Sequence, residues 1–348
     1  MDVQEKSLPI KYPMITTYTQ HAHLLSILEA YHKTEFWIYS NYIQLYSNRD
    51  LTKNIWSDFY FPMPYELRPS DCCKWLITQK ISWNIVKDRN SITQFIIKAI
   101  DSNLYVHLMI DFYYVRQSRI YKKYKQVHDI LIYGYDRNKG FFNCADFLFQ
   151  TTNYEFSKVA FEDMENAFHN AKIEEYCSYL NGLIYLYQFN EKCDYEFDRR
   201  NIINGLLQYY RNAVPEYWML HNQKNGELIA YGMDVYEALI SYMKMSKGKS
   251  FIDVRPLYLL YDHKKIMEHR MKFMENIEGN YRQDQYSKLA CNYDNLVSIS
   301  YVITMMATKY NIMPKEEILD GIVLQLKKLR NKEKEYLEHF FLAGGYLI

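Results

Sequence analysis

The chain has 348 residues, of which 49% are hydrophobic and 24% are charged, and its formal net charge is +1 at pH 7. This composition is typical of a globular protein, and the balanced charge argues against a nucleic-acid-binding protein. The sequence contains no run of about 18 apolar residues and no secretory signal at its start. We therefore expect a cytoplasmic protein that does not span a membrane.

The N-terminal part of the chain is predicted to contain helices followed by strands. The expected helices span 22–32, a second stretch to about 46, a segment beginning near 72, and 92–100. The expected strands span 104–114, 127–135 and 140–144, which are rich in β-branched and aromatic residues. Between the last two strands, Asp136, Asn138 and Gly140 fit a hairpin loop. Helices that precede a sheet within one unit favour an α+β fold.

The rest of the chain is predicted to be mostly helical. Apolar residues recur with a period of about 3.6 residues from about residue 156 onward. Helices are expected over 160–188, 196–213, 232–246, 256–277, 283–310 and 315–341. We therefore expect one domain over 1–155 and a helical domain, or a helical lid, over 156–348.

The strongest chemical pattern lies in the predicted hairpin over 127–147. His128 stands at the start of the first strand, and Asp146 stands just past the returning strand. Antiparallel pairing brings two such positions within reach of each other. A carboxylate that binds an imidazole fixes its tautomer and stabilises the imidazolium, as in a catalytic triad. Because such pairs are also common in structural networks, the pattern predicts either a catalytic or a structural His–Asp pair.

Along the chain, a helix start is followed by a strand that begins near a histidine and then by an aspartate after a hairpin. This order resembles that of the papain-like cysteine enzymes of the C39 peptidase type. The likeness is greatest for their acyltransferase branch, which includes butirosin- and closthioamide-biosynthesis enzymes, and it covers residues 8–150. The resemblance implies a papain-like catalytic domain over 1–155. Those enzymes carry a nucleophilic cysteine where the first helix begins, whereas this chain has His21-Ala22 there. Ala22 then either replaces a natural cysteine by engineering, which we favour, or is native to an inactive relative.

The resemblance also implies roles for the residues around this position. His128 would activate the nucleophile, and Asp146 would orient His128. The positive end of the helix dipole would favour a thiolate at position 22. Papain-like enzymes commonly bind the oxyanion with a glutamine a few residues ahead of the cysteine, whereas this chain has a threonine six positions before Ala22. We expect the Ala22 N–H as one oxyanion donor, and the second donor stays open among Thr16, Tyr18 and Gln20.

Other residues with chemical potential are interpreted as structural. Cys72 and Cys73 stand at a predicted helix start, but the preceding aspartate opposes a thiolate, so we expect buried thiols. His21 and His23 point apart on a helix and lack a carboxylate at useful spacing. We interpret them as polar surface or local hydrogen bonding. The six cysteines show no metal-ligand spacing, and we predict no metal site.

Two further segments are candidates for binding. The basic stretch before His128 is either a solvated loop or a dock for an acidic carrier protein or for its phosphopantetheine phosphate. Its basic residues are Arg116, Arg119, Lys122, Lys123 and Lys125. The acyltransferase branch also tends to carry a Tyr-Gly pair followed by a helix with a tyrosine. Tyr231 and Tyr236 match that pattern, and we expect them either to line an acceptor pocket or to pack in the core.

The resemblance implies an acyltransferase that forms amides in natural-product biosynthesis. An acyl group would pass from a carrier-protein thioester to a cysteine at position 22, and then to a primary amine such as a small diamine. No bound cofactor is expected, because the carrier protein delivers the phosphopantetheine arm, and a homodimer is compatible with these features. Two alternatives stay open. One is a C39-like cysteine peptidase that hydrolyses leader peptides, and the other is a non-catalytic binding relative with a native Ala22.

Overall fold

The structure is a computed structural model that describes residues 3–50, 55–61, 67–88, 91–173, 180, 182–213, 228–278 and 283–347. The chain divides into two compact units. The sheet unit comprises Met1–Thr34 and Arg68–Tyr195, and the helical unit comprises Glu35–Leu67 and Glu196–Ile348. The predicted boundary between 155 and 156 does not match this division, because each unit is built from two separate stretches of chain.

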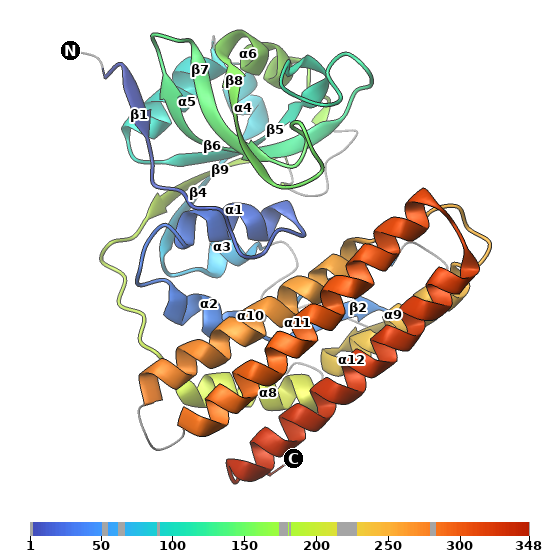
Figure 1. Ribbon diagram of the computed structural model, residues 1–348. Coiled ribbons are helices and arrows are strands. Elements are labelled where there is room, and N and C mark those ends of the chain that lie inside the picture. The colour runs from blue at the N-terminus through green and yellow to red at the C-terminus, as the bar shows by residue number, and fades with distance from the viewer. Residues whose placement is uncertain are drawn as a thin grey trace. The chain divides into compact units, whose positions relative to one another are not determined.

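An antiparallel sheet of seven strands forms the centre of the sheet unit (Figure 1). Its order is β4-β9-β5-β6-β7-β8, and β1 pairs with the far end of β6. The strands are β1 (Glu5–Ser7), β4 (Leu76–Ser82), β5 (Tyr105–Asp111), β6 (Val127–Asp136), β7 (Phe141–Asp146), β8 (Glu155–Ala160) and β9 (Leu183–Phe189). The central strand β5 is buried along its whole length. A mixed α/β unit with an antiparallel sheet agrees with the predicted α+β class.

Helices lie on both sides of this sheet in Figure 1, with α1 on one side and α5 and α6 on the other. The helices are α1 (Thr19–Leu28), α3 (Pro69–Cys72), α4 (Trp83–Lys87), α5 (Ile92–Asp101) and α6 (Phe161–His169), together with the 3-10 turn η1 (Phe112–Tyr114). In α5, Ile92, Ile96 and Ile100 repeat at helical spacing and are fully buried. The side chain of Ser91 caps this helix by accepting a hydrogen bond from the Gln94 N–H.

In the sheet unit, the predictions agree best with the structure for helices and hairpins that are formed by one continuous segment. The helix at 92–100 and the three strands predicted over 104–144 are confirmed, and Gly140 occupies the hairpin turn with a φ of +71°. The helix predicted near 72 is only the single turn α3, which ends at Cys72. The helix predicted over 160–188 is wrong, because α6 ends at His169 and β9 begins at Leu183.

The helical unit packs long helices beside a small antiparallel sheet, whose order is β10-β2-β3. The strands are β2 (Leu45–Asn48), β3 (Ser57–Phe59) and β10 (Ile229–Tyr231). The helices are α2 (Glu35–Asn41), α8 (Arg199–Tyr210), α9 (Val235–Met245), α10 (Arg255–Glu278), α11 (Gln283–Ile312) and α12 (Glu316–Ala343), with the 3-10 turn η4 (Gly232–Asp234). The five predicted helices from 196 to 341 are confirmed, whereas the helix predicted to about 46 gives way to β2. In the described part of the chain, no helix is long and apolar enough to cross a membrane.

A buried ion pair lies in the core of the helical unit. The Lys264 ammonium on α10 lies 2.5 Å from Glu333 Oε1 on α12, and both side chains have no exposed surface. The hydroxyls of Tyr209, Tyr236 and Tyr293 donate hydrogen bonds to the same carboxylate over 3.1, 2.7 and 2.9 Å. Burial lowers the pKa of Lys264 to about 8, although Glu333 opposes that shift. Three tyrosine donors and one ammonium therefore compensate for the desolvation of Glu333.

Gly232 provides a test of backbone packing in the helical unit. Its φ is +58°, and a Cβ at this position would lie 2.2 Å from the carbonyl oxygen of Tyr209. We expect Gly232→Ala to lower the free energy of unfolding by about 2–4 kcal/mol, measured by urea denaturation. Gly248 is the matched control, because its φ is +81° and no atom lies within 4 Å of the added Cβ. Gly248→Ala should cost only about 1–2 kcal/mol, and equal losses for the two variants would contradict the steric account.

Candidate functional site

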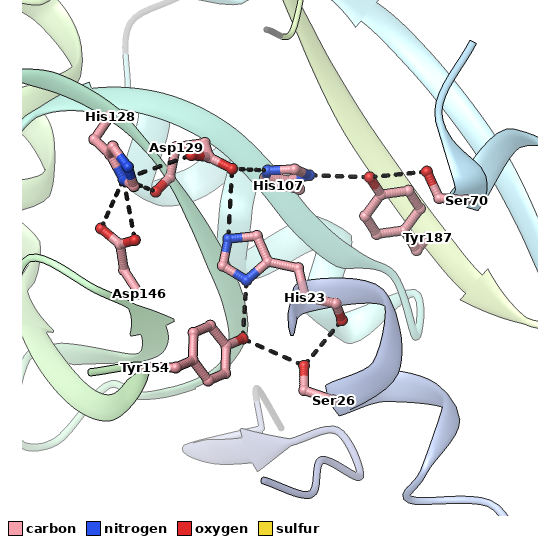
Figure 2. A network of polar contacts seen from close by, with 9 residues as sticks. All are labelled: His23, Ser26, Ser70, His107, His128, Asp129, Asp146, Tyr154 and Tyr187. Carbon is pink, nitrogen blue, oxygen red and sulfur yellow. Dashed lines mark hydrogen bonds and ion pairs between the residues drawn. The ribbon is translucent and has the colours of Figure 1, made fainter. Parts of the chain in front are cut away.

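The structure brings His128 and Asp146 together at one end of the β6–β7 hairpin (Figure 2). His128 is the second residue of β6, and Asp146 is the last residue of β7. Leu131 pairs with Ala145, and continuing this register puts Asp146 diagonally across from His128 on the same face of the sheet. The Nδ1 atom of His128 lies 3.0 Å from Oδ1 and 3.1 Å from Oδ2 of Asp146.

The two ring nitrogens of His128 have different surroundings. Nδ1 also lies 3.1 Å from the carbonyl oxygen of Asp129 and 3.5 Å from its Oδ1. Nε2 has no hydrogen-bond partner among the described residues, and the side chain is 28% exposed. The imidazole is therefore held through one nitrogen, while the other is available to exchange a proton with a bound molecule.

The charges around His128 favour its protonated form. Burial lowers the pKa of this imidazole, but the charge and hydrogen bond of Asp146, together with Asp129, outweigh burial and raise the pKa to about 9. At neutral pH the pair is therefore an imidazolium beside a carboxylate. An imidazolium of this kind stabilises a neighbouring thiolate.

Position 22 lies inside α1 rather than at its start. Because α1 begins at Thr19, the Ala22 N–H already donates to the carbonyl oxygen of Tyr18 over 3.0 Å, and the prediction that it serves as an oxyanion donor is wrong. The Ala22 side chain has no exposed surface. Thr16, Tyr18 and Gln20 lie half-buried at or just before the helix start, where they stay candidates for this role.

A second group of polar residues, which we call the His–Asp cluster, consists of His23, His107 and Asp129 (Figure 2). Asp129 Oδ2 lies 2.8 Å from His107 Nε2 and 3.6 Å from His23 Nε2. The two imidazole rings meet edge to face with centroids 4.8 Å apart. The exposed fractions of the three residues are 1%, 2% and 3%. The interpretation of His23 as polar surface or a purely local hydrogen bond is therefore wrong.

Tyrosines hold the outer nitrogens of both imidazoles in the His–Asp cluster. The Tyr154 hydroxyl lies 2.8 Å from His23 Nδ1, and the Tyr187 hydroxyl lies 2.9 Å from His107 Nδ1. Burial lowers the pKa of His23 well below its ordinary value, so this imidazole is neutral. Burial alone would raise the pKa of Asp129, but the hydrogen bond from His107 and the charge of His128 reverse that shift, so this group is ionised.

Sequence reasoning missed this cluster because its members come from three separate elements. His107 is a polar residue in the middle of the buried strand β5, and such a group needs a partner. The need for a partner could be predicted from the sequence. The identity of the partner could not be predicted, because it depends on the β5–β6 register, in which Met109 pairs with Asp129.

Cys72, Cys73 and Cys144 are poor substitutes for a nucleophile at position 22. Cys73 and Cys144 are buried, and burial raises the pKa of both thiols. Cys72 is exposed, contrary to the prediction of a buried thiol, and partial burial with the charge of Asp71 raises its pKa.

The predicted carrier dock is smaller than its five basic residues suggest. The Arg116 guanidinium binds Asp163 over 2.8 Å and Glu162 over 3.1 Å, and Arg119 is half-buried. Lys122, Lys123 and Lys125 are exposed, and so is Arg116, whose charge is paired with the two carboxylates. This leaves three lysines as the positive surface next to the strand that carries His128.

The two tyrosines predicted to bind substrate belong to the core of the helical unit. Tyr231 is 4% exposed and Tyr236 is 1% exposed. The Tyr236 hydroxyl donates to Glu333 in the buried ion pair. Of the two interpretations left open for these residues, core packing agrees with the structure.

No protein-family model matches the chain, and a search of curated proteins found no match. Support for a function therefore comes from the residues and geometry of this chain.

Proposed function

We propose that the sheet unit is a papain-like acyl-transfer domain in which position 22 is the nucleophile position and His128 and Asp146 are the acid–base pair. With cysteine at position 22, it would move an acyl group from a carrier-protein thioester to a primary amine. The observation that supports this most is the asymmetric environment of His128. Nδ1 is fixed by Asp146, and Nε2 has no partner among the described residues, as a general acid and base requires.

The proposed reaction has two steps. The thiolate at position 22 attacks the thioester carbonyl, and the phosphopantetheine thiolate leaves with a proton from the His128 imidazolium. The amine then attacks the acyl-enzyme, His128 takes a proton from it, and the amide forms as the thiolate of the enzyme is released. Asp146 holds the ring in one tautomer throughout. With Ala22 the chain lacks the group that carries the acyl intermediate.

A second candidate is a non-catalytic relative that keeps the site for binding. The full burial of Ala22 and the hydrogen bond from its N–H to Tyr18 favour this alternative, because a nucleophile and an oxyanion donor must both be accessible.

The test of the proposed function is the Ala22→Cys variant. It is incubated with an acylated carrier protein and a small diamine, and intact masses are followed, with the Ala22 protein as the control. We expect a covalent acyl adduct on the variant alone, followed by release of the amide. Release of free acid alone would support the peptidase-type hydrolysis instead. A folded variant that forms no adduct with thioesters or peptides would support the binding relative.

Charge reversal at Lys122 and Lys123 tests the carrier dock in the Ala22→Cys background. We expect Lys122→Glu with Lys123→Glu to slow acylation by the carrier-bound donor by roughly 10-fold, because long-range attraction raises association rates. Acylation by a small free thioester should stay unchanged. The same reversal at the exposed residues Lys33 and Lys192 serves as a control for net charge. Equal effects of both double reversals on the carrier-bound donor would remove the dock.

A further inference from the structure

The His–Asp cluster of His23, His107 and Asp129 points three ligand-type atoms at one small volume. One atom from each residue lies within 4.8 Å of the other two, and the residues come from α1, β5 and β6. His23 Nε2 has no hydrogen-bond partner among the described residues, although the side chain is 1% exposed. A buried polar atom without a partner requires an explanation.

The contacts around His23 decide where its proton lies. The Ser26 hydroxyl donates to the His23 carbonyl over 2.9 Å, so it can only accept from the Tyr154 hydroxyl 3.3 Å away. Tyr154 has then used its single proton, and it must accept from His23 Nδ1–H. All three contacts are satisfied together only when the neutral His23 carries its proton on Nδ1. Its Nε2 lone pair then faces the Asp129 carboxylate.

His107 is placed in the same way. Its Nε2 lies 2.8 Å from Asp129 Oδ2, and its Nδ1 lies against Tyr187, which in turn lies 3.4 Å from Ser70. Ser70 donates to the Tyr187 hydroxyl. Without a metal His107 Nε2–H donates to Asp129, so binding a metal through Nε2 requires the proton on Nδ1, where the Tyr187 oxygen can accept it. A hydrogen bond to the outer nitrogen is the arrangement that orients histidines in metal sites.

The charges of the surrounding groups favour a cation at this point. Oxygen atoms of two buried carboxylates, those of Asp129 and Asp146, lie within 3.5 Å of His128 Nδ1 next to the cluster. A divalent cation between Asp129 and the two imidazole nitrogens would be stabilised by the Asp129 carboxylate. It would also replace the unfavourable approach of the His23 lone pair to the carboxylate.

We propose that His23, His107 and Asp129 bind a first-row divalent transition metal, for which Zn²⁺ is the best match. Imidazole ligands favour zinc, iron, cobalt or copper over Mg²⁺ and Ca²⁺, which take oxygen ligands. Atoms bound to one tetrahedral zinc at about 2.1 Å lie about 3.4 Å apart. The 3.6 Å separation of Asp129 Oδ2 from His23 Nε2 is close to this value, whereas the 2.8 Å separation from His107 Nε2 would have to widen. Two histidines and one carboxylate leave the fourth position for a water or another ligand. Support for this site does not rest on the proposed acyl transfer.

The test measures metal content rather than activity. The full-length protein is stripped with a chelator, incubated with Zn²⁺ or Co²⁺, passed through a desalting column and analysed by inductively coupled plasma mass spectrometry. We expect one tightly held equivalent, with visible absorption of the Co²⁺ form typical of a four-coordinate site, and none of Mg²⁺. Asp129→Asn and His23→Gln should weaken binding at least 10-fold. Circular dichroism of each variant without metal shows whether it is folded.

Two further variants keep the proposal falsifiable. Tyr154→Phe retains all three ligands but removes the acceptor for His23 Nδ1–H, and we expect it to weaken Zn²⁺ binding by about 10-fold. His169→Gln is the control, because His169 lies 3.3 Å from Glu165 on α6, and a partly exposed His–Glu pair of this kind can bind zinc adventitiously. Full retention of the metal by folded His23→Gln protein, or its loss only in His169→Gln, would overturn the proposal. Absence of any tight equivalent in the unsubstituted protein would overturn it as well.

Discussion

Replacing Glu333 by glutamine is expected to lower the free energy of unfolding by about 3–5 kcal/mol. The carboxylate is fully buried and balances the Lys264 ammonium 2.5 Å away, which is also fully buried. Glutamine keeps the size of the side chain but removes the charge, so it leaves Lys264 with no counter-charge at that contact. Urea denaturation followed by circular dichroism, which reports mainly on helices, measures the loss.

A double-mutant cycle separates the ion pair from simple packing. Lys264→Met combined with Glu333→Gln should be less destabilised than the sum of the two single variants, because neither charge is then left alone. The matched control is Asp320→Asn, which breaks the exposed pair with Lys247 and should leave the free energy of unfolding nearly unchanged. A loss of less than about 1 kcal/mol for Glu333→Gln would contradict the importance of the buried pair.

Removing His128 from the Ala22→Cys variant is expected to slow acylation of position 22 by about 10²- to 10⁴-fold. The ring supplies both the charge that stabilises the thiolate and the proton for the leaving group. Asp146→Asn should also slow the reaction strongly, because the amide no longer fixes the ring through a charged contact at 3.0 Å. Quenched-flow sampling with intact-mass detection measures these rates.

A control variant and the choice of donor isolate the effect of His128 on the rate of acylation. His169→Gln removes a histidine from the surface of the same unit and should leave the rate unchanged. A small, uncharged thioester serves as the donor, so that carrier binding does not contribute. If the variant without His128 acylates as fast as its parent, position 22 and His128 do not act together.

The fold was predictable where elements are local. The β6–β7 hairpin follows from two apolar runs joined by a turn with Asp136 and Gly140, and the long helices follow from sustained periodicity. The pairing of distant segments was not predictable. The run L-I-Y-L-Y-Q-F at 183–189 fits a buried helix or a strand equally well, and only its pairing with β4 and β5 decides for a strand.

In the site, too, contacts within one continuous segment could be predicted, whereas contacts between distant segments could not. One hairpin carries both His128 and Asp146, so their proximity followed from the sequence alone. The His–Asp cluster joins α1, β5 and β6, and no single segment shows it. The error at Ala22 came from the helix boundary: a start at Thr19 puts the N–H of residue 22 inside the helical hydrogen-bond ladder.

The alkylation rate of the thiol in Ala22→Cys tests most directly whether position 22 and His128 share one site. The protein is treated with iodoacetamide at neutral pH, and peptide mapping gives the rate at each cysteine, with the buried Cys144 as the internal reference for an inaccessible thiol. We predict that the introduced thiol reacts much faster than Cys144, and that His128→Ala slows it at least 10-fold. An introduced thiol that is as protected as Cys144, and indifferent to His128, would contradict the account.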